Sequence, residues 1–93
     1  MHEKQTSGKG LLREVVIWKV PKTIRYPDGF RYRLVLVDPG MAKTLLLMDN
    51  HWPKGHHVHR RGREEEPYNF RSLNILVRDF KNWGEQEEVS YEG

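Results

Sequence analysis

The hydrophobic pattern changes its period once along the chain, and this change limits the fold more than any other feature. Residues 30–37 alternate between apolar and charged side chains at their start, which is the two-residue period of a half-buried strand. Residues 71–83 instead repeat their apolar positions every three or four residues, as a helix does. The apolar positions are Phe30, Tyr32, Leu34 and Leu36 in the strand, and Leu73, Leu76, Val77, Phe80 and Trp83 in the helix.

Turn signals divide the region before the helix into further strands. Residues 11–20 are rich in β-branched and aromatic side chains, and residues 42–49 form a second apolar run. The Asp-Pro-Gly turn at residues 38–40 makes the runs on its two sides antiparallel neighbours. Residues 56–60 fit a short edge strand. We therefore predict an α+β fold, with an antiparallel sheet of three to four strands and one C-terminal helix packed on a face.

The helix and the strands are expected to share one core. Ser72 is predicted to cap the helix and Gly84 to end it. The core residues expected from the pattern are Phe30, Tyr32, Leu34, Leu36, Leu45, Leu47, Leu76 and Phe80.

A chain of 93 residues has room for one core. We predict a flexible N-terminus at residues 1–10, a single α+β domain at residues 11–84 and an acidic flexible tail at residues 85–93. Sixteen Lys and Arg residues outnumber thirteen Asp and Glu residues, and four of the glutamates lie in the tail. The remaining part of the chain is therefore basic, which is compatible with a polyanionic ligand.

Composition excludes several classes of protein. The absence of cysteine rules out a disulfide framework, a thiol nucleophile and an iron–sulfur cluster. The longest apolar runs are far shorter than the roughly 20 residues that a membrane span requires. We therefore expect a cytoplasmic protein with no membrane partner.

Histidines and basic residues gather between Asp49 and Phe70. Four of the five histidines lie within nine residues of one another. Metal-free RNA cleavage needs a base for the 2′-hydroxyl, an acid for the leaving oxygen and cations for the phosphate, and these residue types supply all three. The candidate catalytic residues are His57, His59, Lys54 and Tyr68; the candidate phosphate or nucleic-acid ligands are His51, Arg60, Arg61, Arg31 and Arg33; the candidate site-shaping residues are Asp49, Asn50, Gly55 and Glu66.

Two other interpretations of this segment stay open. It is also compatible with a polar connection whose imidazoles serve as ordinary hydrogen-bond partners. His57 and His59 on one strand face, joined by His51 or Asp49, would be a metal site, although the neighbouring arginines repel a cation and we predict no metal or other cofactor. One glutamate of the run at residues 64–66 could pair with Arg60 or orient a histidine.

The same segment resembles the TumE family of bacterial and archaeal toxins. The resemblance covers residues 32–80 and rests on the motifs YRLVLVD, MDNH, KGHHVH, EEEPYNF and LVRDF. The matching positions are Asp49, Asn50, His51, Lys54, Gly55, His57, His59, Glu66, Pro67, Tyr68 and Phe70. The chain departs from the family pattern at His56, where members usually carry aspartate.

The resemblance implies the toxin of a type II toxin–antitoxin module, neutralised by a helix-turn-helix antitoxin. Together with the residues, it leads to the hypothesis of a toxin that acts on RNA, and a metal-independent endoribonuclease is the enzyme class that fits. The alternatives are a non-catalytic module that binds nucleic acid or protein, and a metal-dependent hydrolase. A sheet with an exposed edge also predicts a homodimer or a complex with an antitoxin tail.

Overall fold

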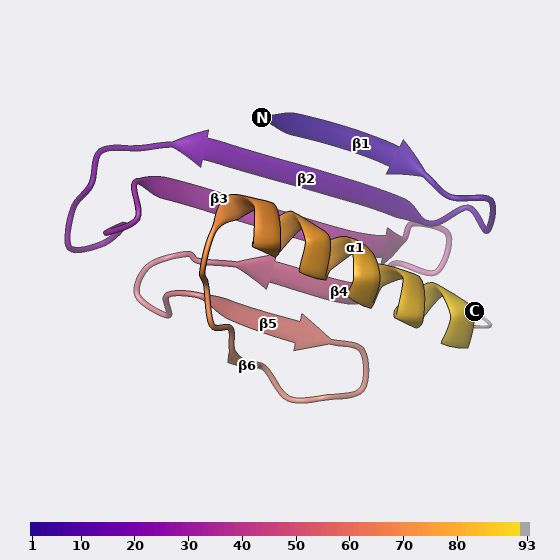
Figure 1. Cartoon of the computed structure of the whole chain (residues 1–93). Coiled ribbons are helices and arrows are strands. Elements are labelled where there is room, and N and C mark those ends of the chain that lie inside the picture. Colours follow the sequence, from indigo (N-terminus) through magenta and orange to yellow (C-terminus); the bar gives the residue numbers. More distant parts are fainter. Residues whose placement is uncertain (92–93) are drawn as a thin grey trace.

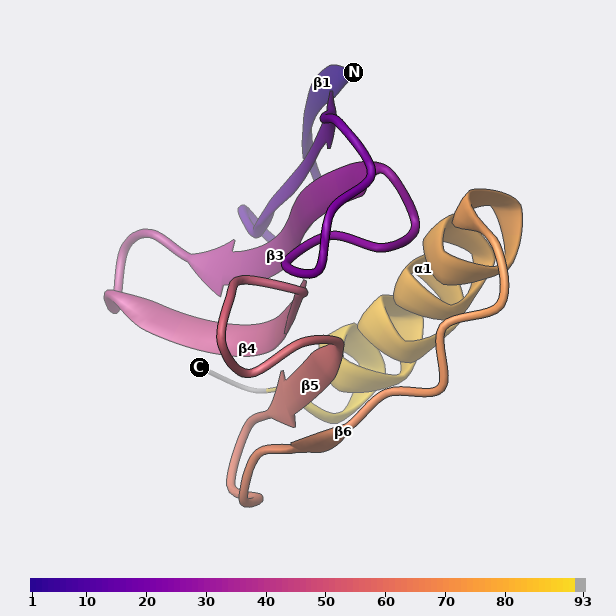
Figure 2. The ribbon, with the colours of Figure 1, turned by 90° about the vertical axis from the view of Figure 1, so that its left-hand side faces the viewer.

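The structure is a computed structural model and describes residues 1–91. Six antiparallel strands form one sheet in which each strand pairs with its neighbour in sequence (Figure 1). The elements are β1 (His2–Thr6), β2 (Leu12–Lys19), β3 (Phe30–Asp38), β4 (Lys43–Asp49), β5 (His57–Arg60), β6 (Glu66–Pro67) and α1 (Leu73–Ser90). Figure 2 shows α1 and the sheet as two layers. The predicted α+β class is confirmed, but the sheet has six strands instead of three to four.

The two additional strands lie at the edges of the sheet. Strand β1 falls within residues 1–10, which were predicted to be flexible, and its side chains are all exposed. Its backbone pairs with β2, with Glu3 opposite Val15. Strand β6 has two residues, and Pro67 lies opposite His57. Both strands are held by backbone hydrogen bonds and carry no alternating apolar pattern, so the hydrophobic periodicity did not predict them.

Helix α1 begins as predicted and ends later than predicted. The Ser72 hydroxyl accepts a hydrogen bond from the backbone N–H of Ile75 at 3.2 Å, which confirms the N-cap. The helix does not end at Gly84 but passes through this buried glycine, where an added Cβ would lie in van der Waals contact with Leu36 of the sheet. Glu88 forms an ion pair with Arg13 of β2. Residues 85–90 of the predicted flexible tail are therefore helical, and Glu92 lies outside the described residues.

The core lies between α1 and the sheet and contains most of the predicted residues. Leu76 and Phe80 are at most 1% exposed. Leu47 is an exception, because a register shift between Leu36 and Val37 changes which β4 residues face the helix. Leu46 lies opposite Leu36 and is buried, whereas Leu47 lies opposite Val35 and is half-buried on the other face. The buried residues of this core cluster are Leu11, Val15, Ile17, Tyr32, Leu34, Leu36, Leu45, Leu46, Met48, Val58, Tyr68, Leu76, Phe80 and Tyr91.

We name the face of the sheet opposite α1 the open face. Within residues 1–91 no helix covers it (Figure 2). Arg31 and Arg33 are exposed and alternate with the buried Tyr32 and Leu34, so both arginines lie on this open face.

A candidate site on the open face around His57

The candidate site begins with a row of three residues on adjacent strands. Arg33 of β3 lies opposite Asp49 of β4, and Asp49 lies opposite His57 of β5. Directly opposite residues of antiparallel strands project from the same face, so all three side chains share the open face. His59 lies two residues after His57, opposite Leu47, and shares this face as the sequence predicts.

His57 is surrounded by hydrogen-bond acceptors. Its Nε2 atom lies 3.0 Å from Asp49 Oδ1 and 3.0 Å from Glu65 Oε1, and its Nδ1 atom lies 2.9 Å from the carbonyl oxygen of Gly55. Because an imidazole donates from both nitrogens only when it is protonated, all of these hydrogen bonds form with the imidazolium. His57 is 7% exposed, but its neighbours are polar. Gly55 adopts a φ of 73°, a conformation that favours glycine, and this turn aims its carbonyl at His57.

Glu65 connects His57 to Lys54. Lys54 Nζ lies 2.7 Å from Glu65 Oε2, and this hydrogen bond lowers the pKa of Glu65 and raises that of Lys54. Both residues line a hollow together with His57 and Glu66, the latter an exposed residue of β6. Glu65 is thus the glutamate of the acidic run that contacts a histidine.

A second hollow lies on the other side of Asp49. Arg31 Nη2 lies 3.1 Å from His51 Nδ1, and the Arg31 guanidinium lies 5.1 Å from the centre of the Trp18 ring. Trp18 is 43% exposed, and Arg33 completes the lining. Asp49 lines this hollow and contacts His57, which lines the first one, so the contact between Asp49 and His57 connects the two hollows.

Asn50 positions the turn that carries His51. Its Oδ1 atom accepts a hydrogen bond from the backbone N–H of Tyr32 at 2.9 Å, and its Nδ2 atom donates to the carbonyl oxygen of Phe30 at 2.8 Å. Asn50 is 4% exposed, so these bonds satisfy a buried amide. Asp49 Oδ1 also accepts from the backbone N–H of His51 at 3.2 Å.

His56, where the chain departs from the family pattern, fastens the β2–β3 loop to β5. Its Nδ1 atom lies 2.8 Å from the hydroxyl of Tyr32, and its Nε2 atom lies 2.9 Å from Asp28 Oδ2. Burial raises the pKa of Tyr32, so this hydroxyl keeps its proton. The His56 ring also stacks on Phe70 at 4.5 Å between ring centres. His56 therefore has partners of its own, distinct from those of His57.

Two of the predicted phosphate ligands instead hold the helix on the sheet. Arg60 alternates away from the open face, and its guanidinium lies 4.3 Å from the centre of the Trp83 ring. Arg61 lies 3.6 Å from Glu87 and 5.0 Å from the Tyr91 ring. Alternation along β5 separates Arg60 from the two histidines, so the predicted convergence of Arg60 with them does not occur.

Tyr68, a predicted catalytic residue, also faces the helix. Its hydroxyl donates a hydrogen bond to Asp79 Oδ2 at 2.6 Å, and the edge of its ring meets Trp83. Burial and this hydrogen bond raise the pKa of Tyr68 to about 12. Tyr68 thus lies among core residues and not beside His57.

Sequence reasoning did not single out Glu65, Trp18 or Asp28. Glu65 lies in a run of three glutamates, and no spacing distinguishes it from its neighbours. Trp18 ends an apolar run in which the inward and outward positions look alike. Only an assigned strand register would have shown that Trp18 faces away from the core.

Within residues 1–91, no three His, Asp or Glu side chains are arranged to hold a metal ion. In the same range, no helix is long and apolar enough to cross a membrane.

Comparison with known families gives a match to the family model described as Toxin TumE, over residues 3–88. The chain belongs to the TumE toxin family. The match includes β2 to β6, all of β1 except His2 and nearly all of α1, and so extends well beyond the motifs between residues 32 and 80. Neither a curated protein nor a solved structure shows a significant match. Membership supports a toxin component of a toxin–antitoxin module, with an antitoxin as its partner.

Proposed function

We propose that this TumE-family toxin acts on RNA at the open face of its sheet. The observation that carries the proposal is the row formed by Arg33, Asp49 and His57 on three adjacent strands. In this row Arg33, the proposed phosphate ligand, and His57 lie on either side of Asp49, whose carboxylate contacts His57. No helix covers this face within residues 1–91.

The two histidines of β5 fit the two proton transfers of RNA cleavage. His59 is exposed and accepts the proton of a ribose 2′-hydroxyl, whose oxygen attacks the adjacent phosphorus. The bond from phosphorus to the 5′-oxygen breaks, and His57 donates its Nε2 proton to that oxygen. The products are a 2′,3′-cyclic phosphate and a 5′-hydroxyl. Residues two apart on a strand are about 7 Å apart, so both imidazoles reach one phosphodiester.

In this proposal the RNA binds at the hollow lined by Trp18, Arg31 and Arg33. Arg31 and Arg33 are exposed and supply charge for phosphates, which arginine binds bidentately. Trp18 is the exposed aromatic ring beside them, and a base stacks on such a ring without regard to sequence. His51 adds a further polar contact at the rim of the same hollow.

The test is cleavage of a labelled single-stranded RNA by the purified toxin, with binding measured on the same RNA. We expect His57→Ala and His59→Ala each to lower the cleavage rate by roughly 100-fold or more, while RNA affinity changes little. The matched control is His2→Ala, because His2 lies on the open face of β1, far from β5, and binds Glu14. Full cleavage by both β5 variants would overturn the catalytic assignment.

A non-catalytic RNA-binding module is the second candidate. It is favoured by the stacking of Arg31 on Trp18, which makes a binding surface without any acid or base. Equal losses of RNA affinity and growth inhibition in the His57 and His59 variants would support it.

The nature of the partners is also part of the proposal. We propose that the antitoxin is a helix-turn-helix protein encoded beside the toxin. The sequence of the neighbouring gene tests this directly. The homodimer stays a prediction, and light scattering at high protein concentration measures it.

A further inference from the structure

A groove lies on the helix side of the sheet, away from the proposed RNA site. Figure 1 shows α1 crossing in front of β3 and β4, while β1 and β2 extend beyond it. Six strands at about 4.8 Å spacing are roughly 24 Å wide. A helix with its side chains is about 10 Å across, so one helix covers only part of this face. The groove runs between α1 and the first two strands.

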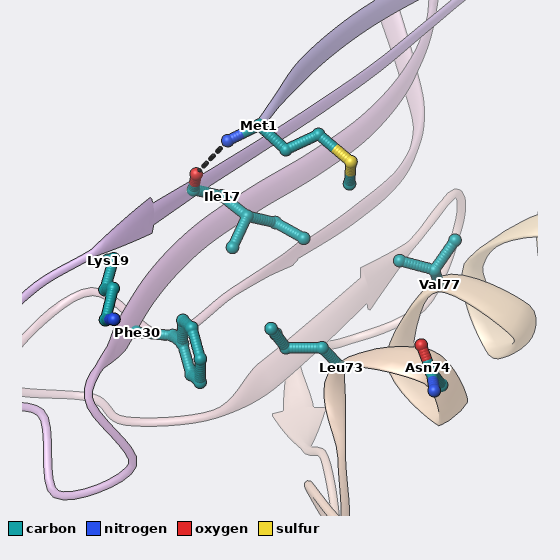
Figure 3. Close-up of a pocket in the computed structure, with 7 residues that line it drawn as sticks. All are labelled: Met1, Ile17, Lys19, Phe30, Leu73, Asn74 and Val77. Atoms are coloured by element: carbon teal, nitrogen blue, oxygen red, sulfur yellow. Dashed lines mark hydrogen bonds between the residues drawn. The ribbon is translucent and has the colours of Figure 1, made fainter.

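The first part of the groove has apolar walls from both layers. Figure 3 shows Ile17 and Phe30 of the sheet and Leu73 and Val77 of α1 pointing into the same space. Met1 borders it and is 59% exposed. Phe30, Leu73 and Val77 are only partly buried, so a bound apolar side chain would remove more of their surface from water.

The groove narrows along α1 to a second hollow of only about 20 Å³. Val15 and Phe80 line it, and Lys81 and two β1 residues also border it. Val15 and Phe80 are already buried, so this end of the groove has no room for a further side chain. The first hollow is therefore the part of the groove that can take an apolar side chain.

The charges beside the groove favour an acidic partner. Lys19 lies at the first hollow and Lys81 at the second, and neither forms an ion pair within residues 1–91. Arg13 is neutralised by Glu88, and Glu3 is the acidic residue at the groove. The first turn of α1, which faces the first hollow, also carries no acidic residue.

We propose that this groove binds an amphipathic helix of the antitoxin. An apolar residue of that helix fills the first hollow, and acidic residues beside it meet Lys19 and Lys81. A helix here would cover the part of the face that α1 leaves uncovered. The inference rests on the antitoxin partner that the family implies, and not on the proposed action on RNA.

The test uses the full-length toxin and the antitoxin encoded by the neighbouring gene. Val77→Glu sets a charge against an apolar anchor, and we expect it to weaken antitoxin binding by at least roughly tenfold. The matched control is Val89→Glu on the same helix, because Val89 is 82% exposed and lies outside the groove. Growth inhibition without antitoxin should persist in both variants, since neither residue belongs to the RNA site.

A second variant keeps the test decisive if Val77→Glu does not fold. Asn74→Trp changes an exposed residue at the first hollow and should block it without burying a charge. Unchanged antitoxin affinity in a folded groove variant, or equal losses for Val89→Glu, would overturn the proposal. An RNA-inactive toxin that still binds antitoxin through the groove would contradict only the proposed function.

Discussion

The Nε2 atom of His57 lies 3.0 Å from Oδ1 of Asp49, directly across the pairing between β5 and β4. This contact joins a carboxylate at the end of one strand to a histidine at the start of the next. It also joins the two hollows of the open face, because Asp49 lines one and His57 lines the other.

Asp49→Asn tests whether this carboxylate serves the chemistry. The substitution keeps the shape of the side chain and removes its negative charge, so Nε2 of His57 loses one of its two carboxylate partners. We expect RNA cleavage to fall by roughly 100-fold while the protein stays folded. The control is Asp28→Asn, which makes the same change beside His56. An equal loss in both variants would show that neither carboxylate acts specifically.

Arg33 and Arg60 should separate RNA binding from stability. Arg33 has a side chain that is 49% exposed on the open face, whereas Arg60 stacks on Trp83. Arg33→Ala should weaken RNA binding and lower the slope of log affinity against log salt by about 1, as loss of one phosphate contact does. Arg60→Ala should leave RNA affinity unchanged and cost about 0.5–2 kcal/mol of unfolding free energy. Filter binding over a salt series and urea denaturation measure the two effects, and the reverse pattern would refute the assignment.

The Lys54–Glu65 pair should make stability depend on pH. The hydrogen bond between them lowers the pKa of Glu65 below 4.5 and raises the pKa of Lys54 above 10.5. Because the pKa of Glu65 is lower in the folded protein, its charge stabilises the fold above the unfolded pKa, and this stabilisation is lost as the pH falls. Because the pKa of Lys54 is higher in the folded protein, its charge stabilises the fold below 10.5, and this stabilisation is lost as the pH rises. Glu65→Gln should therefore lower the melting temperature near neutral pH.

This difference between Glu65→Gln and the unchanged protein should shrink at both ends of a thermal denaturation series from about pH 3 to pH 11. Glu64→Gln is the control, because Glu64 is an exposed neighbour for which the structure shows no ion pair within residues 1–91. A temperature difference that is constant over the whole series would count against the pair.

Tyr68→Phe tests whether Tyr68 has a structural role. The substitution leaves the buried Asp79 without its 2.6 Å hydrogen bond and should cost about 1–3 kcal/mol of unfolding free energy. RNA cleavage by the folded protein should be unchanged, because Tyr68 faces the helix. Tyr26→Phe is the control, since the Tyr26 hydroxyl accepts only a long hydrogen bond of 3.4 Å from the backbone of Trp52. A cleavage defect in folded Tyr68→Phe protein would return Tyr68 to the catalytic candidates.

Local patterns were sufficient for the elements with a buried face. The alternation of residues 30–37 and the apolar stripe of α1 predicted β3, the helix start at Ser72 and the burial of Phe80. The alternation expected of an extended strand at residues 56–60 likewise predicted that His57 and His59 share a face. Such predictions succeed because a residue's side of a strand or helix depends on its position within that element alone.

The partners of those residues depend on contacts between distant segments. The register shift at Leu36 decides that Leu47 leaves the core, and the pairing of β4 with β5 decides that Asp49 meets His57. The alternation of β5 sends Arg60 to Trp83, a residue of α1 that is 23 positions later in the chain. The fold class, the residue types of the site and the face that carries the histidines therefore follow from local patterns. Which charges meet follows from long-range packing, because strand register and helix packing are set by the whole core and not by any one segment.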